Sequence, residues 1–150
     1  MQSSAKTYYR AALERIDDAD LLHTEGHYAF AMYASGLAVE CLLRAFRLLN
    51  DPSFDERHDL WQLWKKTALA NARRESIYEK SFALMSQINL RWRNSFRFAS
   101  IKEASSFLRI AGQQRGIKGD FLKYNSKKLY EAARYLVQLG GQQWINLNKK

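Results

Sequence analysis

The sequence has few of the residues that interrupt a chain or cross-link it. Among its 150 residues there are one proline (Pro52), seven glycines and one cysteine (Cys41). So few chain-breaking residues argue against many short strands and favour long helices. A single cysteine excludes an intrachain disulfide, and no Cys and His residues have the spacing of zinc ligands. We therefore expect no metal site and no cofactor.

Long apolar runs are also absent. Residues 1–10 contain no apolar stretch that resembles a signal peptide. The densest apolar run, residues 29–43, is interrupted by Ser35 and Glu40 and is too short to span a bilayer. Hydrophobic residues make up 47% of the chain and charged residues 26%, as is typical of globular proteins. We expect a single domain over residues 1–150, located in the cytoplasm without membrane contact.

Positive charge is concentrated in the C-terminal part of the chain. Residues 1–90 contain 11 Lys/Arg and 12 Asp/Glu, whereas residues 91–150 contain 13 Lys/Arg and 3 Asp/Glu. This asymmetry indicates an anionic partner, such as nucleic acid, a nucleotide or an acidic protein. The alternative is that these lysines and arginines only keep exposed helices soluble.

Apolar residues recur at helical spacing through most of the chain. The pattern predicts helices over about 4–22, 27–49, 58–69, 75–98 and 125–140, the first capped by Ser3 or Ser4. Gly36, in the apolar second helix, would allow close approach of a neighbouring helix. No segment alternates with period two, so we expect an all-α, up-and-down bundle of four to five helices.

The segment 99–124 gives the weakest pattern. Residues 104–110 are compatible with one or two helical turns. Gly112, Gly116 and Gly119 then occur among basic residues, which predicts a flexible basic loop over about 111–124. Asn125 or Ser126 is the expected cap of the last helix, and residues 140–141, both glycine, are its expected end.

Three segments carry a resemblance to a known family. Residues 26–45 form an aromatic and small-residue run that ends in Val39-Glu40 and a basic residue. His58-Asp59-Leu60 follows, and then the segment 92–98, which reads Trp-Arg-Asn-Ser-Phe-Arg-Phe. In content, order and spacing these segments resemble the HEPN domain family.

The resemblance implies a four- or five-helix bundle, often a homodimer, in bacterial toxin–antitoxin and phage-defence systems. It also implies RNA or a nucleotide as ligand, and an antitoxin or a larger defence complex as protein partner. Many members cleave RNA without metal through an arginine followed four to six residues later by a histidine. Here Arg93-Asn94 matches the start of that motif, but Phe98 and Ala99 occupy the places where the histidine would serve.

Metal-independent RNA cleavage requires a base, an acid and a cation that stabilises the phosphorane. Arginine provides the cation but stays protonated. Arg93 and Arg97, four residues apart in the predicted helix, are expected on one face. His58 is the remaining titratable candidate, and its alternative role is a helix cap or packing residue. The candidate catalytic residues are therefore His58, Arg93 and Arg97, and the candidate phosphate- or nucleic-acid-binding residues are Arg93, Asn94, Arg97, Arg115 and Lys118.

Glu40 lies within the apolar second helix, where an unpaired carboxylate would cost several kcal/mol. We expect it to pair with Arg97 or Arg93, either as a structural ion pair or to orient an arginine in a phosphate-binding cleft.

Three functions remain open from the sequence. These are an RNA- or nucleotide-binding defence protein without standard ribonuclease activity, a non-catalytic helical adaptor or dimerisation subunit, and a non-standard metal-independent ribonuclease.

Overall fold

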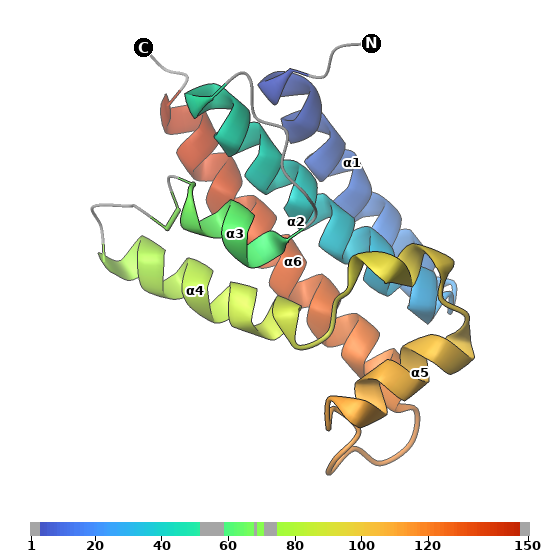
Figure 1. Ribbon diagram of the computed structural model, residues 1–150. Helices are drawn as coiled ribbons and strands as arrows, with labels where there is room; N and C mark the ends of the chain where they lie inside the picture. The colour runs from blue at the N-terminus through green and yellow to red at the C-terminus, as the bar shows by residue number, and fades with distance from the viewer. Residues whose placement is uncertain (1–3, 52–58, 68, 71–74, 148–150) are drawn as a thin grey trace.

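The computed structural model describes residues 4–51, 59–67, 69–70 and 75–147. Over these residues the chain forms six α-helices and one 3-10 helix, with no strand, as Figure 1 shows. The elements in chain order are α1 (Ala5–Thr24), α2 (Tyr28–Asn50), α3 (Leu60–Lys65), α4 (Glu75–Asn89), η1 (Asn94–Phe98), α5 (Ile101–Ile110) and α6 (Phe121–Leu147). The predicted all-α bundle is confirmed.

Helix α2 is the centre of the bundle. It packs against α1, α6, α3 and η1, and 14 of its 23 residues are buried. By length and composition alone α2 could cross a membrane, but 78% of its candidate span is buried inside the protein. Such burial on all sides is the pattern of a core helix, and the area removed from water is the main stabilising contribution to the fold.

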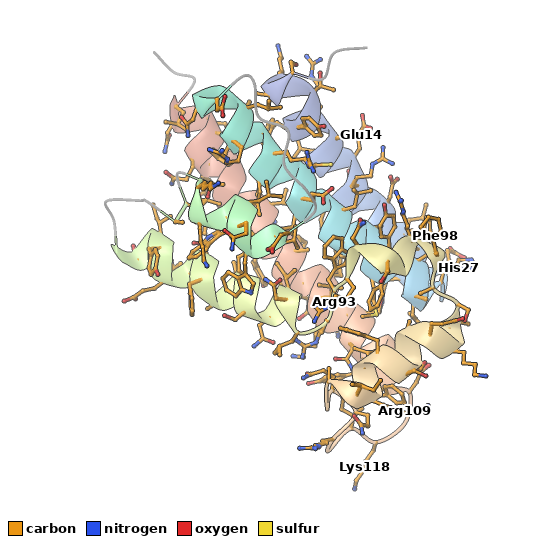
Figure 2. All side chains as sticks on the ribbon, in the orientation of Figure 1. Glu14, His27, Arg93, Phe98, Arg109 and Lys118 are labelled. Atoms are coloured by element: carbon orange, nitrogen blue, oxygen red, sulfur yellow. The ribbon has the colours of Figure 1, made fainter. Side chains whose placement is uncertain are left out.

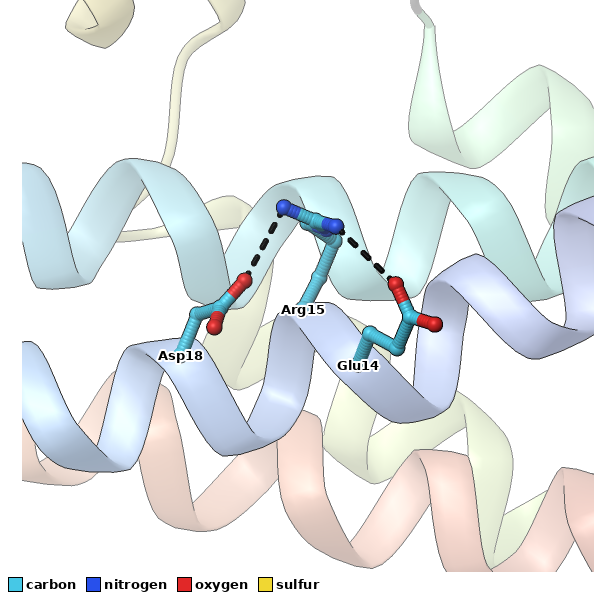
Figure 3. A network of polar contacts seen from close by, with 3 residues as sticks. All are labelled: Glu14, Arg15 and Asp18. Atoms are coloured by element: carbon cyan, nitrogen blue, oxygen red, sulfur yellow. Dashed lines mark hydrogen bonds and ion pairs between the residues drawn. The ribbon is translucent and has the colours of Figure 1, made fainter.

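Helix α1 begins at the predicted cap. The side chain of Ser4 accepts a hydrogen bond from the backbone N–H of Thr7 at 3.2 Å. On α1, Arg15 forms ion pairs with Glu14 at 3.2 Å and with Asp18 at 2.9 Å (Figure 3). These side chains are exposed, so the pairs add little to stability.

The short helix α3 is stabilised at its start by Asp59. The Oδ1 atom of Asp59 accepts a hydrogen bond from the backbone N–H of Gln62 at 3.1 Å. The predicted start of this helix at His58 lies outside the described residues. Its predicted end at Leu69 is wrong, because α3 ends at Lys65.

Helix α4 is shorter than predicted. It ends at Asn89 instead of Phe98, and the chain turns before η1. The turn places the Trp92 indole against α2, where Nε1 donates to the carbonyl of Tyr33 at 3.2 Å. A Cβ atom on Gly36 would lie 2.0 Å from that nitrogen, so Gly36 makes room for a tryptophan side chain rather than for a helix. Tertiary packing of Trp92 thus overrides the helical periodicity.

Helix α5 is longer than the predicted one or two turns. Ser100 and Glu103 form a reciprocal capping box that starts the helix at Ile101. It ends at Ile110, and Gly112, just after the cap residue Ala111, has a φ of +74° that suits a glycine. The backbone N–H groups of Gly112 and Gln113 bond to the carbonyls of Arg109 and Leu108. Residues 111–116 then form successive turns, and whether they are flexible stays a prediction.

Helix α6 starts and ends beyond both predicted limits. It begins at Phe121, where Asp120 accepts a hydrogen bond from the backbone N–H of Lys123 at 3.0 Å. The predicted caps Asn125 and Ser126 are buried inside the helix instead. The predicted basic loop therefore ends before residue 121.

The two glycines of α6 do not end the helix, which continues to Leu147. A Cβ atom on Gly140 would lie 2.6 Å from Cδ2 of Leu42, so this glycine allows close packing of α6 on α2. Beyond the glycines, the Trp144 ring stacks on Tyr9 with ring centroids 4.7 Å apart. This contact ties the end of α6 to α1.

Candidate phosphate-binding cleft

An open cleft of about 640 Å³ lies where the start of α3 meets the end of α4 and η1. Its volume falls in the range of about 300–1,000 Å³ that is typical of small-ligand sites. The cleft brings together two segments that are distant in the sequence but carry the family resemblance. Its lining residues are Asp59, Leu60, Trp61, Asn89, Trp92, Arg93 and Asn94.

Arg93 is the cation that lines this cleft among the described residues. Its Nη1 atom donates to the carbonyls of Asn89 at 3.1 Å and Trp92 at 2.8 Å. Its guanidinium carbon lies 4.8 Å from the centre of the Phe107 ring, on α5. Figure 2 shows Arg93 where the end of α4 approaches α5. These contacts fix one edge of the guanidinium, and its Nε and Nη2 atoms bond to none of the described residues.

Two polar side chains share the cleft with Arg93. Asn94, the first residue of η1, is half-buried, and Asp59 presents a carboxylate from the start of α3. Because Asp59 is negatively charged, the cleft is not uniformly positive. A phosphate group would therefore be favoured only close to Arg93, where the opposite charge lies nearest.

Arg97 does not line the cleft. It is exposed on η1, with its guanidinium carbon 4.6 Å from the centre of the Phe98 ring. The prediction that Arg93 and Arg97 share a helical face is wrong. Arg93 has extended backbone angles, φ −139° and ψ 144°, and η1 is a 3-10 helix with about three residues per turn. A spacing of four residues therefore does not align the two side chains.

Arg115 and Lys118 lie in a different part of the molecule. Both are exposed in the turns between α5 and α6, and Figure 2 shows Lys118 well apart from Arg93. The predicted phosphate-binding residues thus fall into two groups. Arg93 and Asn94 line the cleft, whereas Arg115 and Lys118 belong to a separate basic surface.

The prediction that Glu40 pairs with Arg97 or Arg93 is also wrong. An ion pair joins Oε2 of Glu40 to Nε of Arg44 at 3.7 Å, and both side chains are largely buried. The partner lies one turn further along the same helix, as is common for residues four apart. Among the described residues, the carboxylate of Glu40 therefore pairs with a cation of its own helix and not with Arg93 or Arg97.

No described histidine lines the cleft. His58, the predicted acid–base residue, lies outside the described residues. His27 is exposed at the start of α2 and makes no side-chain capping bond. Nδ1 of His23 lies 2.9 Å from Oγ of Ser126, on α6. Burial is the main cause that lowers the pKa of His23, followed by the charge of Lys123.

Other catalytic chemistries find little support in the described residues. No cluster of three His, Cys, Asp or Glu side chains within the described ranges could hold a metal ion. Burial raises the pKa of the Cys41 thiol to about 11, which keeps it protonated and unreactive at neutral pH. Among the described residues, Arg93 is therefore the group of the cleft that can contact an anion, and Asp59 is the carboxylate that lines it.

A buried arginine that the sequence did not predict directly precedes Trp92 of the cleft. Arg91 is 7% exposed, and its Nε atom donates to Oδ1 of Asn125 at 2.8 Å. Its Nη1 atom donates to the backbone carbonyl and the side chain of Gln87. Burial lowers the pKa of Arg91. A signal was present in the sequence, because Arg91 falls three residues after Ile88 and so continues the three- and four-residue spacing of the apolar positions before it, although α4 itself ends at Asn89.

Residues 5–117 match the sequence model of the HEPN domain. Comparisons with curated proteins and with solved structures gave no match. The matched residues run from α1 to the turns after α5 and include all the residues that line the cleft. Because the match covers well over half of the sequence, this chain belongs to the HEPN domain family.

Proposed function

We propose that this HEPN-family protein binds RNA or a nucleotide through a phosphate contact at Arg93 and Asn94, without the standard ribonuclease activity of the family. The observation that carries the proposal is the Arg93 guanidinium, held on one edge by two carbonyls at the wall of a ligand-sized cleft. A guanidinium fixed on one side loses little further entropy when its other nitrogens bind phosphate oxygens.

The basic surface between α5 and α6 supports RNA over a free nucleotide. Its exposed cations extend well beyond the size of one phosphate group, and they are Arg109, Arg115, Lys118, Lys123, Lys127 and Lys128. Such a surface attracts a polyanion by releasing its counterions, independently of base sequence. RNA thus has two places to contact, the cleft and this surface.

The proposal of absent ribonuclease activity rests on the segment after Arg93. Phe98, at one of the places where the family motif has histidine, is 80% exposed and cannot transfer a proton. An arginine alone stabilises charge but does not exchange protons at neutral pH. RNA incubated with the pure protein in EDTA should therefore remain intact. Cleavage that is lost in both His58→Ala and Arg93→Ala would instead establish the non-standard ribonuclease.

Binding is tested by the fluorescence anisotropy of labelled single-stranded RNA at several salt concentrations. Arg93→Ala should weaken binding about 10- to 100-fold, as expected for the loss of a charge-assisted contact worth roughly 1.5–3 kcal/mol. Arg10→Ala is the matched control, because Arg10 is an exposed arginine of α1 outside the cleft. Equal affinities of the two variants would contradict the assignment of Arg93.

One observation favours the second candidate function, a non-catalytic adaptor. Phe98 and Ile101, 80% and 67% exposed, lie three residues apart around the start of α5. Large apolar side chains that are this exposed and close in sequence are a feature that protein contact sites share. Salt-independent or absent RNA binding would support this function over the first.

The biological setting belongs to the same proposal. We infer a cytoplasmic role in a prokaryotic defence or toxin–antitoxin module, as a homodimer with an antitoxin or a larger complex as partner. The family membership supports this setting. Light scattering of the purified protein measures the oligomeric state, and a neighbouring nucleotidyltransferase-like gene would indicate a toxin–antitoxin pair.

A further inference from the structure

Four aromatic side chains form a cluster between α3 and α4. Trp61 and Trp64 come from α3, and Tyr78 and Phe82 from α4. The ring centroids of Trp61 and Trp64 lie 5.5 Å from Phe82 and Tyr78, respectively. Tyr78 and Phe82 stack at 6.2 Å with their planes only 20° apart. The cluster accounts for much of the packing of α3 on α4.

The cluster has one buried ring, that of Trp64, and partly exposed rings on its solvent side. Trp64 is 3% exposed, and its Nε1 atom donates to Oγ of Ser81 at 3.0 Å. Tyr78 and Phe82 are 40% and 46% exposed, although both are large aromatic residues. A fixed inner ring thus holds two neighbouring rings that remain accessible to a ligand.

A pocket of about 590 Å³ covers this aromatic surface. Asp59, Gln62 and Lys65 provide polar groups at the pocket, next to the aromatic rings. Asp59 and Trp61 line both this pocket and the cleft of Arg93, so the two hollows adjoin. One ligand can therefore contact the cation and the aromatic rings together.

We propose that the surface of Trp61, Tyr78 and Phe82 is a base-stacking subsite for single-stranded RNA whose phosphate lies at Arg93. This inference rests on the proposed function, since it adds the base to the phosphate contact. A nucleobase has an apolar face and a polar edge, and the pocket combines open rings with a carboxylate, an amide and an ammonium group.

The test compares two labelled ligands, a short oligouridylate and a ribose-phosphate chain of equal length without bases. Phe82→Ala should lower the affinity for the oligouridylate about tenfold and leave the affinity for the abasic chain unchanged. Arg93→Ala should weaken both. Tyr135→Ala is the matched control, because Tyr135 is a 52% exposed aromatic residue on α6, outside both hollows.

A second measurement reports on the stacking itself. Oligouridylate should quench the fluorescence of Trp61, and Trp61→Phe should lose most of the quenching while it keeps most of the affinity. The stacking subsite is overturned if Phe82→Ala binds oligouridylate as tightly as the parent protein does. If Arg93→Ala still binds it more weakly, the proposed function stands without the subsite. Failure of the parent protein to bind either ligand would overturn both. Circular dichroism confirms that each variant is folded.

Discussion

Arg91 donates from Nε to Oδ1 of Asn125 at 2.8 Å, which joins the turn after the end of α4 to α6 inside the protein. Asn125 in turn donates from Nδ2 to the carbonyls of Gln113 and Phe121. Each buried polar group of this network thus has a partner. The network holds together three parts of the chain, the end of α4, the turns after α5 and the start of α6.

Arg91→Ala should destabilise the protein by about 2–3 kcal/mol, because it leaves Oδ1 of Asn125 buried without its donor. Urea unfolding followed by circular dichroism measures the change. Arg10→Ala, an exposed arginine of α1, should change the free energy of unfolding by less than about 0.5 kcal/mol. Equal stabilities of the two variants would show that the buried hydrogen bond contributes little.

Gly36→Ala should destabilise the protein and also weaken RNA binding. The new Cβ atom would lie 2.0 Å from Nε1 of Trp92, so the indole must move, and overpacking of this kind costs about 1–3 kcal/mol. Trp92 also lines the cleft, which links the packing to the site. The matched control is Ser35→Ala in the same helical turn. The buried hydroxyl of Ser35 has no hydrogen-bond partner among the described residues, so its removal should be neutral or stabilising.

The stability of the protein should depend on the protonation of His23. Burial, Lys123 and Lys127 lower its pKa, against Asp20 and Glu131, so the fold favours the neutral ring. Tyr28 of α2 packs on the same ring. The stabilisation is therefore complete above the unfolded pKa of about 6.5 and is lost as the pH falls through the lower folded pKa.

Urea unfolding at pH 7.5 and at about pH 5 tests this prediction. The parent protein should lose more stability on acidification than His23→Gln, whose side chain does not titrate in this range. His27→Gln, at an exposed helix start, is the control and should follow the parent protein. The same loss in His23→Gln as in the parent protein would assign the pH dependence to other groups.

Arg115→Ala and Lys118→Ala should each reduce the salt dependence of RNA binding. Each loses about one phosphate contact, so the slope of log affinity against log salt should fall by about 0.7 for single-stranded RNA. Arg93→Ala should lower the slope by a similar amount. It should also reduce the loss of RNA affinity that Phe82→Ala causes, because the cleft of Arg93 adjoins the aromatic rings and the turns do not. Unchanged slopes in Arg115→Ala and Lys118→Ala would exclude the turns from the RNA-binding surface.

The positions of the helices were largely predictable because helical periodicity is local. The start of α1 at Ser4 and the extent of α2 followed from caps and from the spacing of apolar residues. The predicted helix ends were wrong where contacts between residues far apart in the sequence decide whether a helix stops or continues. Trp92 packs on Gly36 and ends the expected long helix early, and Gly140 packs on Leu42 inside a helix it was expected to end.

The candidate site was predictable only in part. The sequence alone determined the HEPN resemblance, the lack of a histidine at Phe98 and Ala99, and the basic C-terminal part, because these are properties of residue identity and spacing. Only the tertiary structure decided which residues meet. It placed Arg93 beside Asp59, separated it from Arg97, and gave Glu40 the partner Arg44. Such pairings depend on where helices end and turn, which is fixed by packing between residues far apart in the chain.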